Sequence, residues 1–218
     1  MRNLPLYHLR VHTPRLELRL PSAQDLDDLA DLAAEGVHPA DYMPFTYPWT
    51  DAPPAEVGQR AVLYHLRTLG SWTPEKWRLP LAVVHDGEIA GIQEVGAEDF
   101  AVVGEVGTGS WLGRRFQGRG IGTEMRRAVL HLAFEGLRAR AALTDIFEDN
   151  HASLGVTRKL GYLPNGSRSL SRRGEAATQL LFRLPRTGWR PEPGYEISGL
   201  RECLPWFGGI FHERDGLT

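Results

Sequence analysis

The chain has 218 residues, of which 42% are hydrophobic and 24% are charged, and these proportions are typical of a globular protein with one full core. Its formal net charge of -2 and pI near 6.5 exclude the general basic field that attracts nucleic acid. The single cysteine, Cys203, excludes an internal disulfide and a cysteine-based zinc cluster, and no metal cofactor is expected.

The hydrophobic runs of the chain indicate where the protein resides. The first residues contain no apolar stretch of signal-peptide length, and no later run approaches the ~20 apolar residues that span a bilayer. We therefore expect a cytoplasmic protein with neither a membrane nor a nucleic acid as its partner.

The first part of the chain predicts a strand, a helix and a long loop. Residues 15–20 alternate apolar and polar side chains, as a half-buried strand does. Ser22 with Asp25 three residues later is a capping pattern that predicts a helix over 22–35. Prolines interleaved with aromatic residues make 38–54 a loop. Long loops are often functional, so we assign this one to the acceptor pocket, although its aromatic residues could simply cap the core.

The rest of the chain mixes strands and helices. An Asp-Gly pair at 86–87 between two β-rich runs predicts a hairpin. From Gly120 onward apolar residues recur at helical spacing, which is the strongest helical pattern in the sequence. The elements predicted after the loop are a helix over 55–69, strands over 79–85, 88–92 and 107–112, a helix from 120, a strand over 142–147, a helix over 150–160 and a strand over 179–184. This order predicts a mixed α/β fold.

Three glycines, Gly118, Gly120 and Gly122, stand directly before that strongest helix. Glycine lets the backbone approach a ligand closely, and the first N–H groups of a helix point outward at its positive end. The pattern therefore predicts a site for a phosphate anion, although a merely flexible strand-to-helix turn would also explain it. Three arginines would supply cations beside the anion: Arg114, Arg115 and Arg119.

Two other kinds of phosphate-binding loop do not fit this segment. A Walker loop requires Gly-Lys followed by Ser or Thr, and the sequence has none. A dinucleotide fingerprint requires its third glycine three residues after the second, where Thr123 stands, and the preceding hairpin does not suit a βαβ unit. A nicotinamide-dependent enzyme is therefore disfavoured.

Residues 110–124 resemble motif A of the GNAT acyltransferases, and 150–153 with 159–162 resemble the family's next motif. The similarity extends over about 1–190 and is greatest to the ribosomal-protein-acetylating type. Within that type it is greatest to an actinobacterial branch that includes a mycobacterial protein described as a succinyl-CoA transferase. Residues 191–218 would then be a C-terminal extension, packed either on the domain or on another subunit of a homo-oligomer.

The resemblance implies an α+β GNAT fold whose mixed sheet has about six to seven strands, flanked by helices, with a splayed strand pair that holds CoA. It implies an N-acyltransferase that uses acetyl-CoA or succinyl-CoA as co-substrate and a small molecule or a protein as the amine acceptor, through direct attack in a ternary complex. The CoA-binding residues implied are Trp111, Leu112, Gln117, Gly118, Arg119, Gly120, Ile121, Gly122, Thr123, Asn150 and Ser153.

Direct transfer requires an acid to protonate the departing thiolate and a base to keep the amine neutral. Ser153 matches a family position whose hydroxyl faces the CoA sulfur, and we take it as the acid, although Asn150 could simply cap a helix and leave Ser153 as a bystander. Glu94 ranks first as the base. The other candidates are Asp99, Glu105, His38 and a chain of waters.

A noncatalytic acyl-CoA sensor or scaffold with the same fold is the alternative function, because a fold does not by itself settle an activity. The presence of Ser153 favours catalysis, whereas Cys203, far from the motifs in sequence, gives little support to a cysteine acyl-enzyme.

Overall fold

A computed structural model describes residues 3–210, and in this part of the chain nine strands form one mixed sheet. The order across the sheet is β7-β8-β6-β5-β4-β3-β2-β1-β9, and every neighbouring pair is antiparallel except β5 and β6. The strands are β1 (Arg10–His12), β2 (Leu16–Arg19), β3 (Lys76–His85), β4 (Glu88–Glu98), β5 (Glu105–Leu112), β6 (Ala141–Phe147), β7 (Leu163–Arg172), β8 (Glu175–Pro185) and β9 (Glu196–Ser198).

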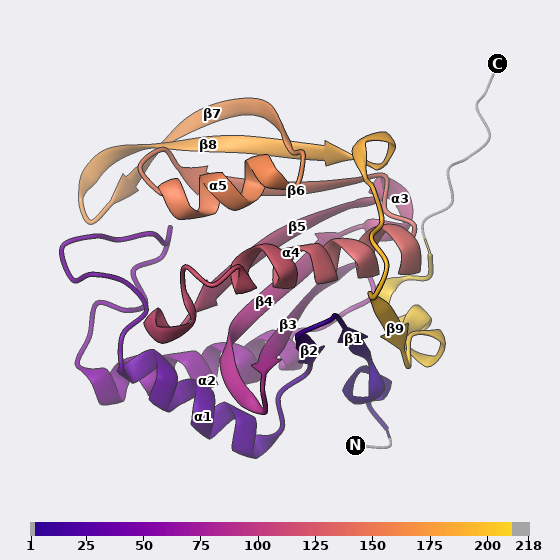
Figure 1. The fold of residues 1–218 in the computed structure, drawn as a ribbon, viewed down its shortest axis with the longest axis horizontal. Helices are drawn as coiled ribbons and strands as arrows, with labels where there is room; N and C mark the ends of the chain where they lie inside the picture. Colours follow the sequence, from indigo (N-terminus) through magenta and orange to yellow (C-terminus); the bar gives the residue numbers. More distant parts are fainter. Residues whose placement is uncertain (1–2, 211–218) are drawn as a thin grey trace.

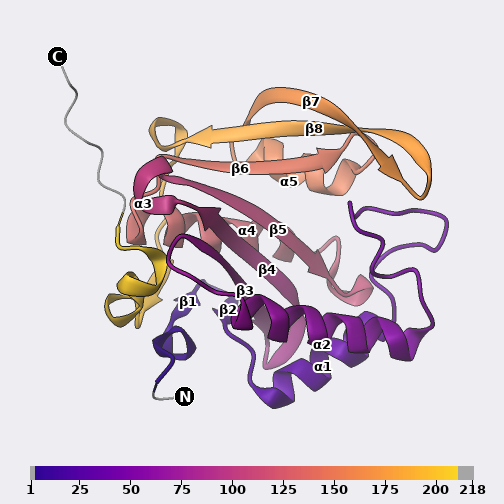
Figure 2. The same ribbon diagram turned by 180° about the vertical axis from the view of Figure 1, so that it is seen from behind.

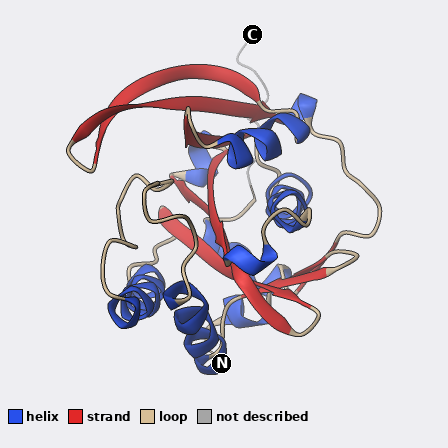
Figure 3. Cartoon of the chain, turned by 60° about the vertical axis from the view of Figure 1, so that its left-hand side comes forward, coloured by secondary structure: helices blue, strands red, loops and turns tan. Residues whose placement is uncertain are grey.

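Helices cover both faces of the sheet (Figures 1 and 3). The pair α1 and α2 packs on one face, whereas α4 and α5 lie together on the other (Figures 1 and 2). The helices are α1 (Ala23–Ala34), α2 (Pro54–Gly70), α3 (Phe100–Val103), α4 (Ile121–His131, continued by a π-helical turn at Leu132–Gly136) and α5 (His151–Lys159). None of the helices within 3–210 is both long and apolar enough to cross a membrane.

The hairpin of β3 and β4 forms at the predicted turn. Asp86 and Gly87 both adopt positive φ, at 51° and 82°, and this conformation matches the twist of the two strands. Both strands continue well beyond their predicted lengths, from Lys76 and to Glu98, because their outer halves also pair. The hairpin brings β4 to the middle of the sheet, next to β5.

The predicted α+β class with helices on a mixed sheet is confirmed, but the sheet has nine strands rather than six to seven. The strands that the sequence did not predict are β1, β7 and β9. Two of them have only three residues, and β7 is an edge strand whose side chains are almost all exposed. Neither case produces the apolar alternation from which a half-buried strand is recognised.

The described part of the C-terminal extension packs on its own domain. Strand β9 pairs with β1, with Val11 opposite Ile197. Further on, Phe207 is fully buried, and its ring contacts Trp72 and Trp77 at centroid distances of 5.6 Å and 4.8 Å. The extension thus adds a strand and core contacts to the domain, whereas its last residues, 211–218, lie outside the described part of the chain.

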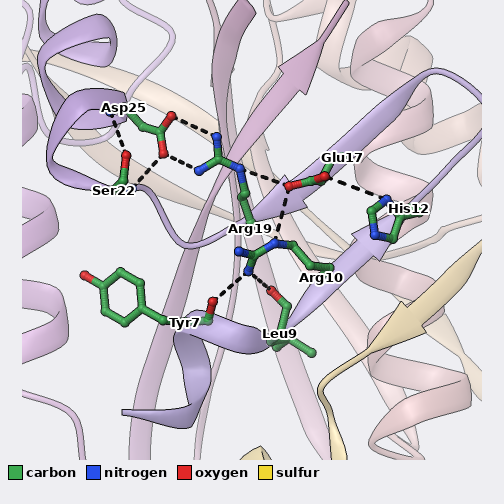
Figure 4. A network of polar contacts seen from close by, with 8 residues as sticks. All are labelled: Tyr7, Leu9, Arg10, His12, Glu17, Arg19, Ser22 and Asp25. Carbon is green, nitrogen blue, oxygen red and sulfur yellow. Dashed lines mark hydrogen bonds and ion pairs between the residues drawn. The ribbon is translucent and has the colours of Figure 1, made fainter. Parts of the chain in front are cut away.

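The amino terminus of α1 is fixed by a reciprocal cap. The Ser22 hydroxyl accepts the Asp25 N–H at 3.2 Å, and the Asp25 carboxylate accepts the Ser22 N–H at 2.7 Å. The same carboxylate pairs with Arg19 of β2, and Glu17 bridges Arg19 and Arg10 at 3.0 Å and 3.3 Å. Figure 4 shows this chain of contacts from α1 across β2 to β1. It fixes the first helix to the sheet.

We expect Asp25→Asn to lower the free energy of unfolding by about 2 kcal/mol near pH 7, because a charged acceptor is lost from both the cap and the ion pair. Burial by itself raises the pKa of Asp25, but the hydrogen bonds from Arg19 and Ser22 outweigh it and hold that pKa below its usual value. The wild-type advantage should therefore be complete above about pH 4 and disappear as the pH falls through the folded-state pKa.

Urea unfolding of both proteins over a pH series measures this difference. Asp28→Asn is the matched control, since Asp28 is exposed and accepts a hydrogen bond only from Gln24 on the same helix. A stability difference between wild type and Asp25→Asn that does not change with pH would contradict the assignment.

Candidate active site

Strands β5 and β6 separate after three paired residues. They pair at Glu105–Ala141, Val106–Ala142 and Gly107–Leu143, and from there β5 continues to Leu112 paired only with β4. Figure 2 shows the two strands together at the end near α3 and diverging towards the other end. Residues 108–112 consequently present backbone groups on the β6 side that no strand occupies.

The glycine-rich loop follows β5 directly and leads into α4. Gly118 and Gly120 have φ values of 71° and 82°, in the left-handed region that glycine adopts without strain. Gly120 is the residue before the first turn of α4, and no side chain caps that helix end. The first N–H groups of α4 and the positive end of its dipole are therefore available to an anion.

Gly122 brings the loop, β5 and α5 together. A Cβ on Gly122 would lie 3.7 Å from Leu112 Cδ1 and 3.8 Å from Val156 Cγ2. The start of α4 therefore lies against the end of β5 and against α5, although the predicted CoA residues Leu112 and Ile121 have buried side chains. A ligand that binds at the start of α4 can therefore extend along the unpaired edge of β5.

Two of the predicted CoA-binding side chains make internal contacts. The Gln117 amide donates to the carbonyls of Val37 and Leu112 at 2.8 Å and 2.9 Å, so this side chain shapes the loop. The Trp111 ring packs on Trp49 of the aromatic loop with centroids 5.7 Å apart. Both residues support the site from the side of α1 and of the loop over 38–53.

One arginine beside the loop was not among the three that the sequence suggested, and one of those three has another partner. Arg115 pairs with Glu35, the residue that follows α1, and is therefore already engaged. The additional guanidinium beside the loop belongs to Arg15, whose Nη2 would lie 3.3 Å from a Cβ on Gly120. Arg15 also donates to the Arg119 carbonyl at 3.2 Å. No local pattern reveals this residue, because more than 100 residues of chain separate it from the loop.

Arg15 is held by Glu124 in the first turn of α4. The Glu124 carboxylate accepts from Arg15 Nη2 at 2.6 Å, from its Nε at 2.7 Å and from the Thr13 hydroxyl at 2.6 Å. These contacts fix the segment before β2 to the start of α4. A cation is thereby positioned beside the anion-binding helix end.

Glu94 lies on β4 beside the middle of β5. Its Oε2 accepts from the Tyr64 hydroxyl of α2 at 3.1 Å and from Arg78 at 3.2 Å, and would lie 3.6 Å from a Cβ on Gly109. Its other oxygen, Oε1, is buried without a hydrogen-bond partner among the described residues. Burial raises the pKa of Tyr64, with a further contribution from Glu94, so this hydroxyl remains a donor to the carboxylate.

The other carboxylate and histidine candidates are less well placed. Glu105 lies where β5 begins, at the opposite end from the glycine loop, and pairs with Arg183 and Arg140. Asp99 precedes α3 near the same end. Both ring nitrogens of His38 already have partners, the Pro39 carbonyl and the Thr50 hydroxyl, each at 2.7 Å.

Asn150 and Ser153 stand at the start of α5. The Asn150 side-chain oxygen accepts the Ser153 N–H at 3.1 Å, so Asn150 caps the helix, as the alternative interpretation of this pair required. The Ser153 side chain is half-buried in the first turn. Capping uses the Asn150 oxygen and the Ser153 backbone and leaves the Asn150 amide nitrogen and the Ser153 hydroxyl for a ligand.

Comparison with known proteins agrees with this geometry. The family model described as an acetyltransferase (GNAT) domain matches residues 15–163, which include β2, the glycine loop, α4 and α5. The chain belongs to the GNAT acetyltransferase family.

Solved structures share the fold at low sequence identity. Mycobacterium smegmatis RimJ in complex with CoA-disulfide superimposes with a TM-score of 0.69 at 15% identity, covering 95% of this chain and 99% of that protein. RimL, a ribosomal-protein acetyltransferase bound to coenzyme A, gives 0.64 at 18% identity, covering 81% and 97%. The microcin self-immunity acetyltransferase MccE, with acetyl-CoA and AMP, gives 0.64 at 15% identity, covering 79% and 93%.

Gly120→Glu should weaken CoA binding at least about tenfold, because the new carboxylate repels a phosphate at the helix end and draws Arg15 away from Glu124. Calorimetric titration with CoA measures the loss. Gly166→Glu is the matched control: Gly166 also has positive φ, 101°, with open space around it, but lies on the edge strand β7. Equal CoA affinity in the two folded variants would remove the glycine loop from the site.

Proposed function

We propose that the protein transfers an acetyl or succinyl group from CoA directly to a primary amine. The observation that carries this proposal is the open edge of β5 over 108–112, which leads straight to the uncapped start of α4. The helix end suits a pyrophosphate, and the strand edge suits the amide groups of a pantetheine arm. The two adjoin through Gly122, as a single extended ligand requires.

In the proposed step the amine nitrogen attacks the thioester carbonyl, a C–N bond forms, and the C–S bond then breaks. The amine loses a proton to Glu94, and the departing CoA thiolate gains one from the Ser153 hydroxyl, which takes a proton from solvent in the same step; Glu94 later returns its proton to solvent. Backbone N–H groups of the open β5 edge would stabilise the tetrahedral oxyanion. A cysteine acyl-enzyme has no support, because Cys203 is buried with its thiol against the Gly199 carbonyl and burial raises its pKa to about 11.

The acceptor is proposed to approach from the side of α1 and α2. Glu94 faces Tyr64 on that side, and the aromatic residues Phe45, Trp49 and Trp111 lie in contact along it. Ribosomal-protein amines are the first acceptors to examine, since RimL is a ribosomal-protein acetyltransferase with the same fold. The relationship to the ribosomal-protein-acetylating type and its actinobacterial branch is part of this proposal, as is the succinyl donor.

Release of free CoA thiol from acetyl-CoA and succinyl-CoA tests the proposal, with protein N-termini, lysine peptides and small amines as acceptors. Mass spectrometry of each acceptor identifies the group transferred. A noncatalytic acyl-CoA sensor, the alternative function, would bind either donor without amine-dependent thiol release. That outcome would overturn the proposed function.

Glu94→Gln should lower kcat/KM by roughly 10²-fold or more, because the amide cannot accept the proton of the attacking amine. The affinity for the CoA donor should stay unchanged, since Glu94 lies on the acceptor side. Tyr64→Phe is the matched control, which keeps the carboxylate and removes one of its donors. Steady-state kinetics separate the two variants. A Glu94→Gln enzyme with wild-type kcat/KM would exclude this residue as the base.

Ser153→Ala should lower kcat by about tenfold to 10²-fold and leave the dissociation constant for CoA nearly unchanged. The effect falls at the low end for a general acid because a thiolate is a good leaving group near neutral pH. Single-turnover rates and calorimetry measure the two quantities, with exposed Ser171→Ala as the control. Normal turnover with weakened CoA binding would instead make Ser153 a positioning contact.

A further inference from the structure

A buried arginine lies where β5 and β6 separate. Arg126 extends from α4 and is 4% exposed. Its Nη2 donates to the Ser110 hydroxyl of β5 at 3.3 Å, and its Nη1 donates to the Thr144 hydroxyl of β6 at 3.4 Å. Both hydrogen bonds are long, and the third nitrogen, Nε, is buried with no partner in the described chain.

The charge of Arg126 has no carboxylate partner within residues 3–210. The two hydroxyls that it reaches are neutral, and the buried Tyr162 phenol beside it is an uncharged group as well. Burial lowers the pKa of Arg126, but a guanidinium remains protonated throughout the physiological range. An uncompensated buried cation is destabilising, because its desolvation is not offset by a counter-ion. Such a residue is therefore suited to receive an anion from outside the chain.

The position of Arg126 connects it to the donor site. Gly122 and Arg126 are four residues apart and so lie on the same face of α4, and Gly122 faces the end of β5 and α5. Thr144 is the first residue of β6 beyond its last pair with β5, and Ser110 belongs to the unpaired edge. The guanidinium thus spans the gap between the separated strands, on the side of the sheet that carries α4 and α5.

The pyrophosphate of CoA is a poor match for this guanidinium. Arg126 is six residues into α4 from Gly120, or about 9 Å along the helix axis, and Arg15 already supplies the cation at the helix end. Arg126 instead contacts Ser110 on the open β5 edge, where the pantetheine arm is proposed to lie, so the anion that it receives would belong to the thioester end of the donor. An acetyl group carries no such anion, whereas a dicarboxylic acyl chain ends in one.

We propose that Arg126, with the hydroxyls of Ser110 and Thr144, binds the terminal carboxylate of a dicarboxylic acyl-CoA and so selects a donor of the succinyl-CoA class over acetyl-CoA. This inference rests on the proposed use of an acyl-CoA and adds a specificity-determining residue to it. The planar guanidinium can bind a carboxylate through two hydrogen bonds, and the hydroxyls can donate to the same group. With acetyl-CoA these donors stay unmatched.

The experiment compares succinyl-CoA with acetyl-CoA in wild type, Arg126→Met and Arg126→Lys. Arg126→Met has a similar length and no charge, and should lower the affinity and kcat/KM for succinyl-CoA about 10²-fold while leaving those for acetyl-CoA unchanged or improved. Arg126→Lys keeps the charge without the planar fork and should lose less. Arg140→Met is the control, because the exposed Arg140 pairs with Glu105 at the opposite end of β5 from the glycine loop.

Two readouts separate this inference from the proposed function. Calorimetry measures the affinity for both donors whether or not transfer occurs, so a selective loss of succinyl-CoA affinity in Arg126→Met supports the inference even without turnover. If the wild-type protein transfers acetyl groups from acetyl-CoA and does not bind succinyl-CoA more tightly, the inference is overturned, but the proposed acyltransferase function stands. An equal loss for both donors would also overturn it. If Arg126→Met does not fold, Thr144→Val can be used instead, because it removes one of the two hydroxyls. This variant should also lose affinity for succinyl-CoA but not for acetyl-CoA, by a smaller factor.

Discussion

The separation of β5 from β6 after three paired residues is the constraint on which the site depends. A parallel pair that continued to Leu112 would satisfy its own backbone groups and leave none for a ligand. Because the strands diverge, β5 keeps one edge paired to β4 and presents the other. The same divergence makes room for α5 to lie beside α4, with Gly122 between them. The open strand edge and the contact between α4 and α5 at Gly122 are therefore consequences of one feature of the sheet.

The alternation of side chains along β5 divides the chemistry between two faces. Gly109 and Ser110 are consecutive, so they face opposite sides of the sheet. On the side of α2, the absent side chain of Gly109 leaves space against which Glu94 lies. On the side of α4, the Ser110 hydroxyl reaches Arg126. Glu94, the proposed base, and Arg126, the proposed cation for the acyl chain, thus lie close to the same strand without pairing with each other.

Local signals in the sequence predicted most of the elements that hold the site. The turn at 86–87 and the cap at Ser22 depend on residues close in the chain, and both form as expected. The burial of Arg126 was not predicted, because arginines on a helix usually lie on a solvated face and only packing shows that this one is buried. Likewise, Arg15 and the partners of Glu94 come from elements distant in sequence, and no single-segment pattern can pair them.

The two buried charges beside β5 differ in how they are compensated, and this difference separates their roles. Glu94 has the cation of Arg78 and the Tyr64 hydroxyl within hydrogen-bond distance, so its carboxylate is held in place while Oε1 remains unbonded. Arg126 has only neutral hydroxyls. A held carboxylate with one unbonded oxygen is suited to accept a proton, which changes its charge by one unit during the reaction. A guanidinium does not release its proton at physiological pH, so its contribution is limited to the recognition of charge.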